Sequence, residues 1–207
     1  MDDAIIVFAG GEHLRPSLVS ELPEPTTVYA ADSGYDNALR LGYRVERVIG
    51  DLDSISAIPP EEVAIERHPT DKDATDLELA MGAAYRAEPE RIVVVGGEGG
   101  RLDHALAVAT TVASPQWAGV EIDWIHNHGA VHVVREETRE LHGDEGRVIS
   151  LIPVGGDARG VTTTGLQWPL ENDVLAYGTT RGVSNRFSSP IATVTVAEGC
   201  LLAVIPR

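Results

Sequence analysis

Cysteine is almost absent from this chain of 207 residues, in which Cys200 is the only one. An intrachain disulfide is therefore excluded. Long apolar runs are missing too, because no stretch approaches the roughly 18 apolar residues of a membrane-spanning helix. The N-terminus, Met1-Asp2-Asp3, lacks the positive charge that begins a secretory signal peptide. These absences predict a cytoplasmic protein.

Positive charge is also scarce. Lysine and arginine together number 16 against 32 acidic residues, which gives a net charge of −16, and Lys72 is the only lysine. A chain this acidic lacks the cationic surface that releases counterions from nucleic acids or attaches to anionic lipids. We therefore expect neither a nucleic-acid partner nor a membrane partner. An anionic substrate would need metal cations or a few well-placed arginines.

Three common sequence motifs of enzymes are absent. The chain has no Gly-Lys-Ser/Thr, so it carries no Walker A loop, and it lacks the Gly-x-Gly-x-x-Gly spacing of a dinucleotide site. It also has no Gly-x-Ser-x-Gly, which disfavours an α/β-hydrolase. Any chemistry must therefore be argued from other residues.

The first half of the chain alternates short apolar runs with helical patterns. Continuous apolar runs are typical of parallel strands that are covered on both faces. The expected strands are 4–9, 27–31, 45–49, 64–66 and 91–95, and the expected helices are 35–41, 75–87 and 102–113. This alternation predicts an α/β domain with a mostly parallel, Rossmann-like sheet.

From about Ala130 the pattern changes to short, β-branched segments that alternate with turn signals such as Gly155-Gly156-Asp157. Helical periodicity nearly disappears. This half predicts a small all-β domain, a sandwich or a barrel. We place the boundary between His126 and Gly129, which divides the chain into domains 1–127 and 128–207.

Acidic or glycine-rich loops follow four of the expected strands. Because ligands bind at the carboxyl ends of strands in an open α/β sheet, these loops should converge on one edge. The loops are 32–34, 50–54, 68–76 and 96–104.

Asp51 and Asp53 are alternate residues of an extended segment, so their side chains point the same way about 6.6 Å apart. Such a pair can hold a hard cation, and Mg²⁺ prefers oxygen ligands. Asp76 falls in the first turn of the helix over 75–87, where the helix dipole favours an anion. The alternative is that Asp51 and Asp53 form turns and that Asp73 or Thr75 caps the helix. Convergence of several acidic loops favours metal binding.

The segment Gly96-Gly97-Glu98-Gly99-Gly100-Arg101 joins a strand to a helix. Glycines allow backbone N–H groups to approach a phosphate, and Arg101 can donate to phosphate oxygens. The alternative is a flexible turn with a surface arginine. Lys72 indicates either a phosphate contact or a salt bridge with Asp71 or Asp73.

In the second half, Gly182-Val183-Ser184-Asn185-Arg186-Phe187 is a polar interruption between apolar runs. Ser184 and Asn185 can hydrogen-bond an organic substrate. On this segment alone the alternative, a simple turn, is favoured.

Taken together, five motifs give the chain a resemblance to the thiamine pyrophosphokinase family. They occur in the order and at about the spacing of that family and extend over nearly the whole chain. The motifs are Ala31-Asp32-Ser33-Gly34, Gly50-Asp51-Leu52-Asp53-Ser54, Asp71-Lys72-Asp73-Ala74-Thr75-Asp76, Gly99-Gly100-Arg101-Leu102-Asp103-His104 and Gly182-Val183-Ser184-Asn185.

The resemblance implies an ATP-binding α/β domain, a β domain that helps to bind thiamine, and a homodimer with thiamine held between domains of different subunits. The implied reaction moves the terminal pyrophosphoryl group of ATP to the thiamine hydroxyl and releases AMP. Mg²⁺ is the implied cofactor. The resemblance implies these roles: Asp51, Asp53 and Asp76 as metal ligands, Asp32 as a further catalytic carboxylate, Lys72, Asp73, Thr75, Arg101 and Asp103 on the nucleotide side, and Ser184 and Asn185 on the thiamine side.

One position departs from the family. Arg186 follows the Ser-Asn pair, where the family often has an acidic residue. Because thiamine is a cation, this arginine would either weaken its binding or turn outward into solvent. Two alternatives therefore stay open: a pyrophosphokinase for another heterocyclic alcohol, and a non-catalytic protein that binds nucleotide or thiamine phosphate.

Overall fold

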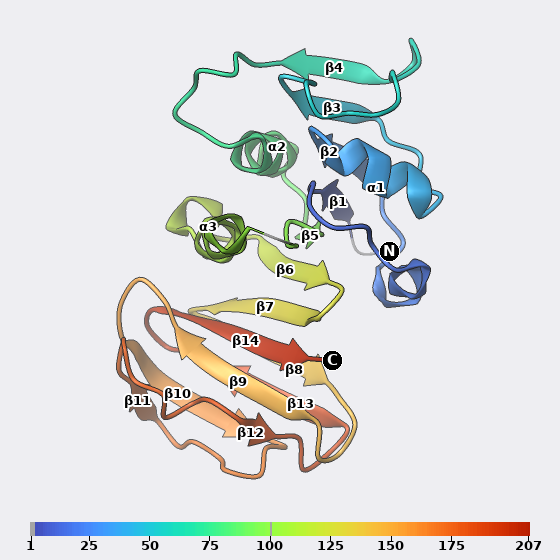
Figure 1. Ribbon diagram of the computed structural model, residues 1–207. Coiled ribbons are helices and arrows are strands. Elements are labelled where there is room, and N and C mark those ends of the chain that lie inside the picture. The colour runs from blue at the N-terminus through green and yellow to red at the C-terminus, as the bar shows by residue number, and fades with distance from the viewer. Residues whose placement is uncertain (1–2, 100) are drawn as a thin grey trace. The chain divides into compact units, whose positions relative to one another are not determined.

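The computed structural model describes residues 3–99 and 101–207 (Figure 1). The chain divides into two compact units, Met1–Asn127 and His128–Arg207.

The first unit is built on a parallel sheet in the order β6-β5-β1-β2-β3-β4. Its central strands are apolar and almost fully buried, as expected for a sheet covered on both faces. The strands are β1 (Ala4–Phe8), β2 (Thr27–Ala31), β3 (Arg47–Gly50), β4 (Ala64–Arg67), β5 (Arg91–Val95) and β6 (Glu121–His126). The prediction of a mostly parallel sheet is confirmed.

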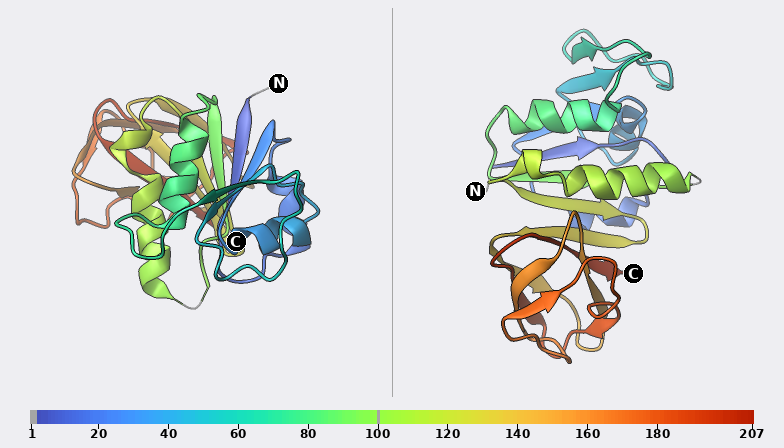
Figure 2. Two further views of the ribbon diagram at one scale, coloured as in Figure 1. Left: turned by 90° about the horizontal axis from the view of Figure 1, so that it is seen from above. Right: turned by 90° about the vertical axis from the view of Figure 1, so that its left-hand side faces the viewer.

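Helices cover both faces of this sheet, with α2 and α3 on one face and α1 on the other (Figure 2). The helices are α1 (Gly34–Arg40), α2 (Asp76–Tyr85) and α3 (Leu102–Val112), with two 3₁₀ segments, η1 (Pro16–Glu21) and η2 (Pro115–Trp117). The apolar side chains of α2 that are buried include Leu77, Ala80, Met81 and Ala84. In the part of the chain that is described, none of the helices is long and apolar enough to cross a bilayer.

Strand β6 was not among the predicted strands, because Asp123 interrupts its apolar pattern. In the structure Asp123 is fully buried, and its carboxylate accepts a hydrogen bond of 2.7 Å from Nε of Arg91 on the neighbouring strand β5. The Nη2 group of Arg91 contacts the same oxygen. A charge supplied by the adjacent strand thus allows an aspartate inside the sheet.

The second unit is β-rich, as predicted, and its strands pair antiparallel in the orders β12-β9-β14-β7 and β11-β10-β13-β8. Buried side chains that include Leu151, Val161, Phe187 and Leu201 form its core. The strands are β7 (Gly129–Arg135), β8 (Thr138–His142), β9 (Val148–Pro153), β10 (Ala158–Thr164), β11 (Asp173–Leu175), β12 (Asn185–Arg186), β13 (Ile191–Thr195) and β14 (Cys200–Pro206).

Strands β8, β11 and β12 were not predicted. In β8 the inward-facing residues are Arg139 and Leu141, so a buried arginine disguises the alternation of polar and apolar side chains. Arg139 donates from Nη1 to the carbonyl of Val133 at 3.2 Å, which provides a partner for its buried charge. Strands β11 and β12 are only three and two residues long, too short to give a periodic pattern.

Candidate active site

Four aspartates from separate segments gather at the carboxyl end of the first unit's sheet. Asp32 follows β2, Asp51 and Asp53 follow β3, and Asp76 begins α2. Carboxylate oxygens of Asp32, Asp51 and Asp53 all lie within 4.8 Å of one another. Asp32, Asp51 and Asp53 are therefore the three carboxylates spaced to hold a metal ion, whereas the resemblance implied Asp51, Asp53 and Asp76 as the metal ligands.

Asp76 lies beside this group, and Gly50 explains how it comes so close. A Cβ atom built on Gly50 would lie 3.0 Å from Cγ of Asp76 and 3.2 Å from Cβ of Asp32. The φ angle of Gly50 is 147°, which L-residues rarely adopt. A glycine at the end of β3 therefore lets the carboxylates of β2 and α2 approach each other.

The backbone around the carboxylates is strained. Asp32 and Leu52 have positive φ angles of 44° and 66°, which non-glycine residues seldom adopt outside special sites. Two carboxylates hold the loop after β3: Asp51 Oδ1, within the loop, accepts from the amide of Asp53 at 3.2 Å, and Asp36 Oδ2, on α1, accepts from the amide of Ser56 at 2.9 Å. The loop is thus shaped around the carboxylates.

The electrostatics of the group suit a divalent cation. Burial raises the pKa of Asp32, and the charges of Asp76 and Asp51 raise it further, against hydrogen bonding from Ser33 and Ser54. Among the described residues, its buried Oδ1 accepts no hydrogen bond. The backbone N–H of Asp53 lowers the pKa of Asp51, and Lys72 adds to that effect. A group of close carboxylate oxygens, in which the buried Asp32 Oδ1 accepts no hydrogen bond from the part of the chain that the structure describes, fits the preference of Mg²⁺ for oxygen ligands.

We expect Asp32→Asn to stabilise the protein at pH 7 in EDTA by about 0.5–1 kcal/mol, a value discounted for partial exposure. The raised pKa means that folding disfavours the ionised form, so removing the charge removes that cost. Asparagine also tolerates the positive φ at this position. The same variant should lose the stabilisation that MgCl₂ gives the parent. Urea unfolding with and without MgCl₂ measures both effects, and a lower stability in EDTA would contradict the prediction.

Lys72 pairs with the carboxylates of this group. Its Nζ lies 3.1 Å from Asp76 Oδ1 and 3.9 Å from Asp51 Oδ2, and it donates to the carbonyl of Pro69 at 2.9 Å. The salt bridge suggested by the sequence thus exists, but its partners are Asp51 and Asp76 instead of Asp71 or Asp73. Asp76 lies only four residues further along the chain, whereas Asp51 is brought near only by the fold.

A cleft of about 380 Å³ lies next to the carboxylates. Two glycine-containing loops form one wall, and they are joined by hydrogen bonds from the Gly97 amide to the Gly10 carbonyl at 2.8 Å and from the Glu12 amide to the Glu98 carbonyl at 2.7 Å. Gly100, part of the predicted phosphate loop, lies outside the described residues. The lining includes Gly10, Gly11, Asp32, Ser33, Ser54, Thr75, Asp76, Gly97, Glu98, Gly99, Arg101, His104 and Thr111.

The residues expected on the nucleotide side occupy different positions around this cleft. Thr75 lines the cleft and caps α2, because its hydroxyl accepts from the Glu78 amide at 3.2 Å, so the capping alternative is confirmed for Thr75. Asp73 is exposed. Arg101 lines the cleft with a largely exposed side chain that ion-pairs with Asp103 at 2.6 Å. The hydrogen bond from Arg101 lowers the pKa of Asp103 to about 2.

Glu98 puts a carboxylate into the glycine-rich loop, and the structure shows its partner. Glu98 pairs with Nδ1 of His126 at the end of β6, and the His126 ring stacks on Trp124 with a centroid distance of 4.6 Å. Both paired side chains are nearly buried. The pair connects the loop after β5 to the neighbouring strand β6.

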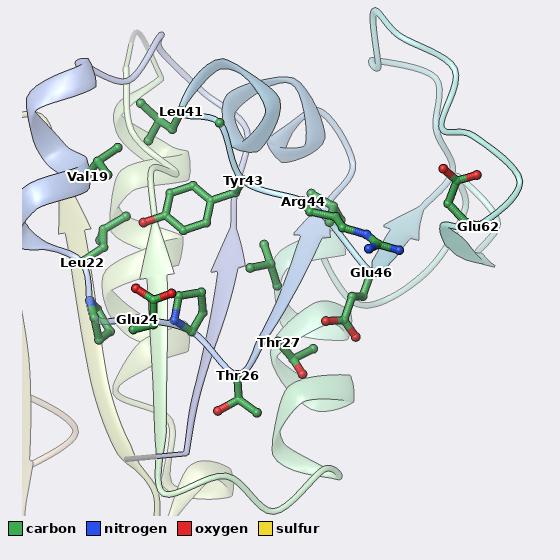
Figure 3. Close-up of a pocket in the computed structure, with 15 residues that line it drawn as sticks. Val19, Leu22, Glu24, Thr26, Thr27, Leu41, Tyr43, Arg44, Glu46 and Glu62 are labelled. Atoms are coloured by element: carbon green, nitrogen blue, oxygen red, sulfur yellow. The ribbon is translucent and has the colours of Figure 1, made fainter. Parts of the chain in front are cut away.

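A larger cavity, of about 770 Å³, lies at the opposite end of the same sheet (Figure 3). It is lined at the amino ends of β2 and β3, where Tyr43 lies near Val19 and Leu22, and it carries Glu24 and Glu46. The carboxylates of Asp32 and Asp76 and the glycine-containing loops line the smaller cleft, and oxygens of Asp51 and Asp53 lie close to Asp32. Chemistry, not volume, therefore identifies the smaller cleft as the candidate site.

In the second unit, the Ser-Asn pair organises an exposed tryptophan. The Asn185 side chain is buried, and its amide bonds the backbone of Trp168 twice, from Nδ2 to the carbonyl at 2.8 Å and from the Trp168 N–H to Oδ1 at 3.1 Å. The Trp168 side chain is 55% exposed. Ser184 is exposed, has a φ of 64°, and donates its amide to Ser150 Oγ at 3.0 Å. Asn185 thus supports the loop that carries Trp168, and the exposed groups here are Ser184 and Trp168.

Arg186 turns away from the Ser-Asn pair. Its side chain is exposed and its Nη1 donates to the carbonyl of Gly146 at 2.7 Å. Of the two expectations for this arginine, the outward orientation is the one that the structure favours.

Several residues, in the cleft and outside it, were missed by sequence reasoning. Gly10 and Gly11 directly follow the first expected strand, and the rule that ligands bind at strand ends would have found them. His104 stands in a quoted motif but had no role assigned. Glu98–His126 and Trp168 had no local signal, because their partners come from elsewhere in the chain.

Comparisons with known proteins agree with this arrangement. The thiamin pyrophosphokinase catalytic-domain model matches residues 20–122, and the thiamin pyrophosphokinase vitamin B1 binding-domain model matches residues 131–201. The chain is 29% identical over 205 residues to thiamine pyrophosphokinase from Bacillus subtilis (strain 168), covering 96% of each sequence.

Solved structures show the same likeness. The crystal structure of thiamine pyrophosphokinase from Bacillus subtilis superposes with a TM-score of 0.84 at 27% identity over 99% of both chains. That from Geobacillus thermodenitrificans gives 0.81 at 27% identity over 99% of this chain and 97% of that one. Thiamin pyrophosphokinase from Candida albicans, at 12% identity and a TM-score of 0.78, shares the fold. The sequence matches to both halves and the carboxylate-lined cleft lead to one conclusion: this chain belongs to the thiamin pyrophosphokinase family of enzymes.

Proposed function

We propose that this chain transfers the terminal pyrophosphoryl group of ATP to the hydroxyl of thiamine, giving thiamine diphosphate and AMP. The observation that carries the proposal is the group of Asp32, Asp51 and Asp53 oxygens within 4.8 Å, with Asp76 and a glycine-lined cleft beside it. In this proposal residues 1–127 form a Rossmann-like nucleotide domain, and residues 128–207 form a β-sandwich that binds thiamine.

Asp32, Asp51 and Asp53, with Asp76 beside them, would hold Mg²⁺. Bound there, the metal would neutralise negative charge on the phosphate oxygens as the pyrophosphoryl group moves. The carboxylates supply the oxygen ligands, and the burial of Asp32 makes its charge costly without a cation. Either Asp32 or Asp76 would take the proton of the attacking hydroxyl as general base.

The cleft supplies the remaining contacts to a polyphosphate. Backbone N–H groups of the loops around Gly10 and Gly97 can approach phosphate oxygens closely, because these positions carry no side chain. The exposed Arg101 can leave its pair with Asp103 and donate two hydrogen bonds to a phosphate. Positioning and charge neutralisation are the main requirements of phosphoryl transfer.

On the thiamine side, Trp168 presents a flat ring and Ser184 a hydroxyl. Thiamine carries a positive charge in an aromatic ring, which favours stacking on an indole. We expect Trp168→Ala to raise the KM for thiamine about tenfold, while leaving the KM for ATP unchanged. Trp168→Phe keeps an aromatic face and should recover most of the loss. Steady-state kinetics with each substrate varied measures this, and equal changes in both KM values would contradict it.

We also propose a homodimer. Helix α3 exposes Leu102 and Leu106 one turn apart, with exposed fractions of 74% and 59%. Apolar side chains at this spacing form a face that a second copy of the chain would cover. Light scattering after size-exclusion chromatography gives the mass directly, and a monomer at working concentration would reject the proposal.

The activity is tested by incubating the protein with ATP, MgCl₂ and thiamine and separating the products. Equal amounts of AMP and thiamine diphosphate are expected. ADP in place of AMP would show a different transfer, and binding of both substrates without turnover would indicate a sensor. Turnover with another heterocyclic alcohol, and none with thiamine, would identify a different acceptor.

A further inference from the structure

Lys72 lies among the carboxylates as a positive charge that belongs to the protein itself. Its Nζ is 3.1 Å from Asp76 Oδ1 and 3.9 Å from Asp51 Oδ2. All three side chains are largely buried, with Lys72 exposed by only 15%. It is also the single lysine of a chain with net charge −16.

We propose that Lys72 is an internal counter-cation that competes with Mg²⁺ for the carboxylates of Asp51 and Asp76. The inference rests on the metal site of the proposed function. Asp51 supplies an oxygen to the group within 4.8 Å and is also a partner of Lys72, so a metal ion held there shares its ligand with an ammonium. The Lys72 ammonium and a metal ion that share one carboxylate repel each other, so each binds the carboxylate less strongly when the other is present.

The local geometry makes this ammonium displaceable. Its contact with Asp51, at 3.9 Å, is too long for a hydrogen bond, so the attraction there is electrostatic alone. Lys72 also precedes α2, which begins at Asp76, and a helix N-terminus repels a cation. The surrounding carboxylates therefore hold the ammonium in place, and a divalent ion that neutralises them loosens it.

Lysine suits this role better than arginine would. An ammonium is a compact point charge on a flexible chain of four carbons, so it can move without rebuilding the loop. The same Nζ donates to the carbonyl of Pro69 at 2.9 Å, and this oxygen lies outside the carboxylate group. The hydrogen bond to Pro69 can therefore be kept while the ammonium pivots away from the carboxylates. The consequence is an affinity for Mg²⁺ lower than the carboxylates alone would give.

The test compares Lys72→Met with the parent protein and with two controls. Lys72→Arg keeps the charge, and Arg44→Met removes the same charge from an exposed residue at the other end of the sheet (Figure 3). Each protein is freed of metal with EDTA and titrated with MgCl₂ alone, by calorimetry and by thermal unfolding.

We expect Lys72→Met to bind Mg²⁺ between about threefold and tenfold more tightly than the parent. It should unfold at a lower temperature in EDTA, because Asp51 and Asp76 then lack their cation, and gain more from MgCl₂. Lys72→Arg should bind Mg²⁺ no more tightly than the parent, because it keeps a positive charge beside the carboxylates, and Arg44→Met should bind Mg²⁺ like the parent. Equal or weaker Mg²⁺ binding by Lys72→Met overturns the competition while leaving the proposed function intact. Failure of every protein to bind Mg²⁺ overturns the metal site and the inference with it.

Discussion

Asp51→Asn should lower the rate of AMP formation about a thousandfold while the protein stays folded. An amide is a weaker ligand for a hard cation than a carboxylate, and Asp51 supplies oxygens both to the three-aspartate group and to the pair with Lys72. The amide oxygen of the asparagine can still accept from the Asp53 amide, so the loop keeps this hydrogen bond and the loss falls on the metal site. Turnover is measured at saturating ATP and thiamine, with circular dichroism as the check on folding.

The control for this prediction is Asp71→Asn, the same chemical change at an exposed residue of the chain that leads into α2. It should keep turnover within about twofold of the parent, as surface substitutions usually do. A folded Asp51→Asn protein with near-normal turnover would reject Asp51 as a metal ligand. Equal losses in both variants would point to net charge instead of ligation.

The second large effect concerns stability. Asp123→Ala should lower the free energy of unfolding by about 3 kcal/mol, because it leaves the Arg91 guanidinium without its buried partner. The Asp123 side chain is fully buried and receives both Nε and Nη2 of Arg91, whose own side chain is about a quarter exposed. Urea unfolding gives the change directly.

A double variant separates the loss of the pair from the loss of packing. Arg91→Met combined with Asp123→Leu removes both charges and fills the space with apolar atoms. It should recover most of the stability that Asp123→Ala loses, since an apolar pair can replace a buried ion pair at little cost. A double variant less stable than Asp123→Ala would show that packing, not charge, explains the effect.

Much of the first unit follows from the sequence alone. In β5 the four residues after Arg91 are all apolar, and a strand buried on both faces is the simplest explanation of such a run. The meeting of Asp32, Asp51, Asp53 and Asp76 also follows, because the carboxyl ends of parallel strands share one edge of a sheet. The family resemblance rests on the same short motifs, and the matches to both domain models confirm it.

Other features were decided only by tertiary structure. Asp123 interrupts the apolar pattern of β6, and Arg139 interrupts the alternating pattern of β8. Each buried charge is tolerated because another segment supplies its partner. Likewise, Lys72 pairs with Asp51 and Asn185 supports Trp168 across separations that no local pattern records. The physical reason is common to all: periodicity and turn chemistry act between near neighbours in sequence, whereas a buried polar group is satisfied by whichever segment the fold places beside it.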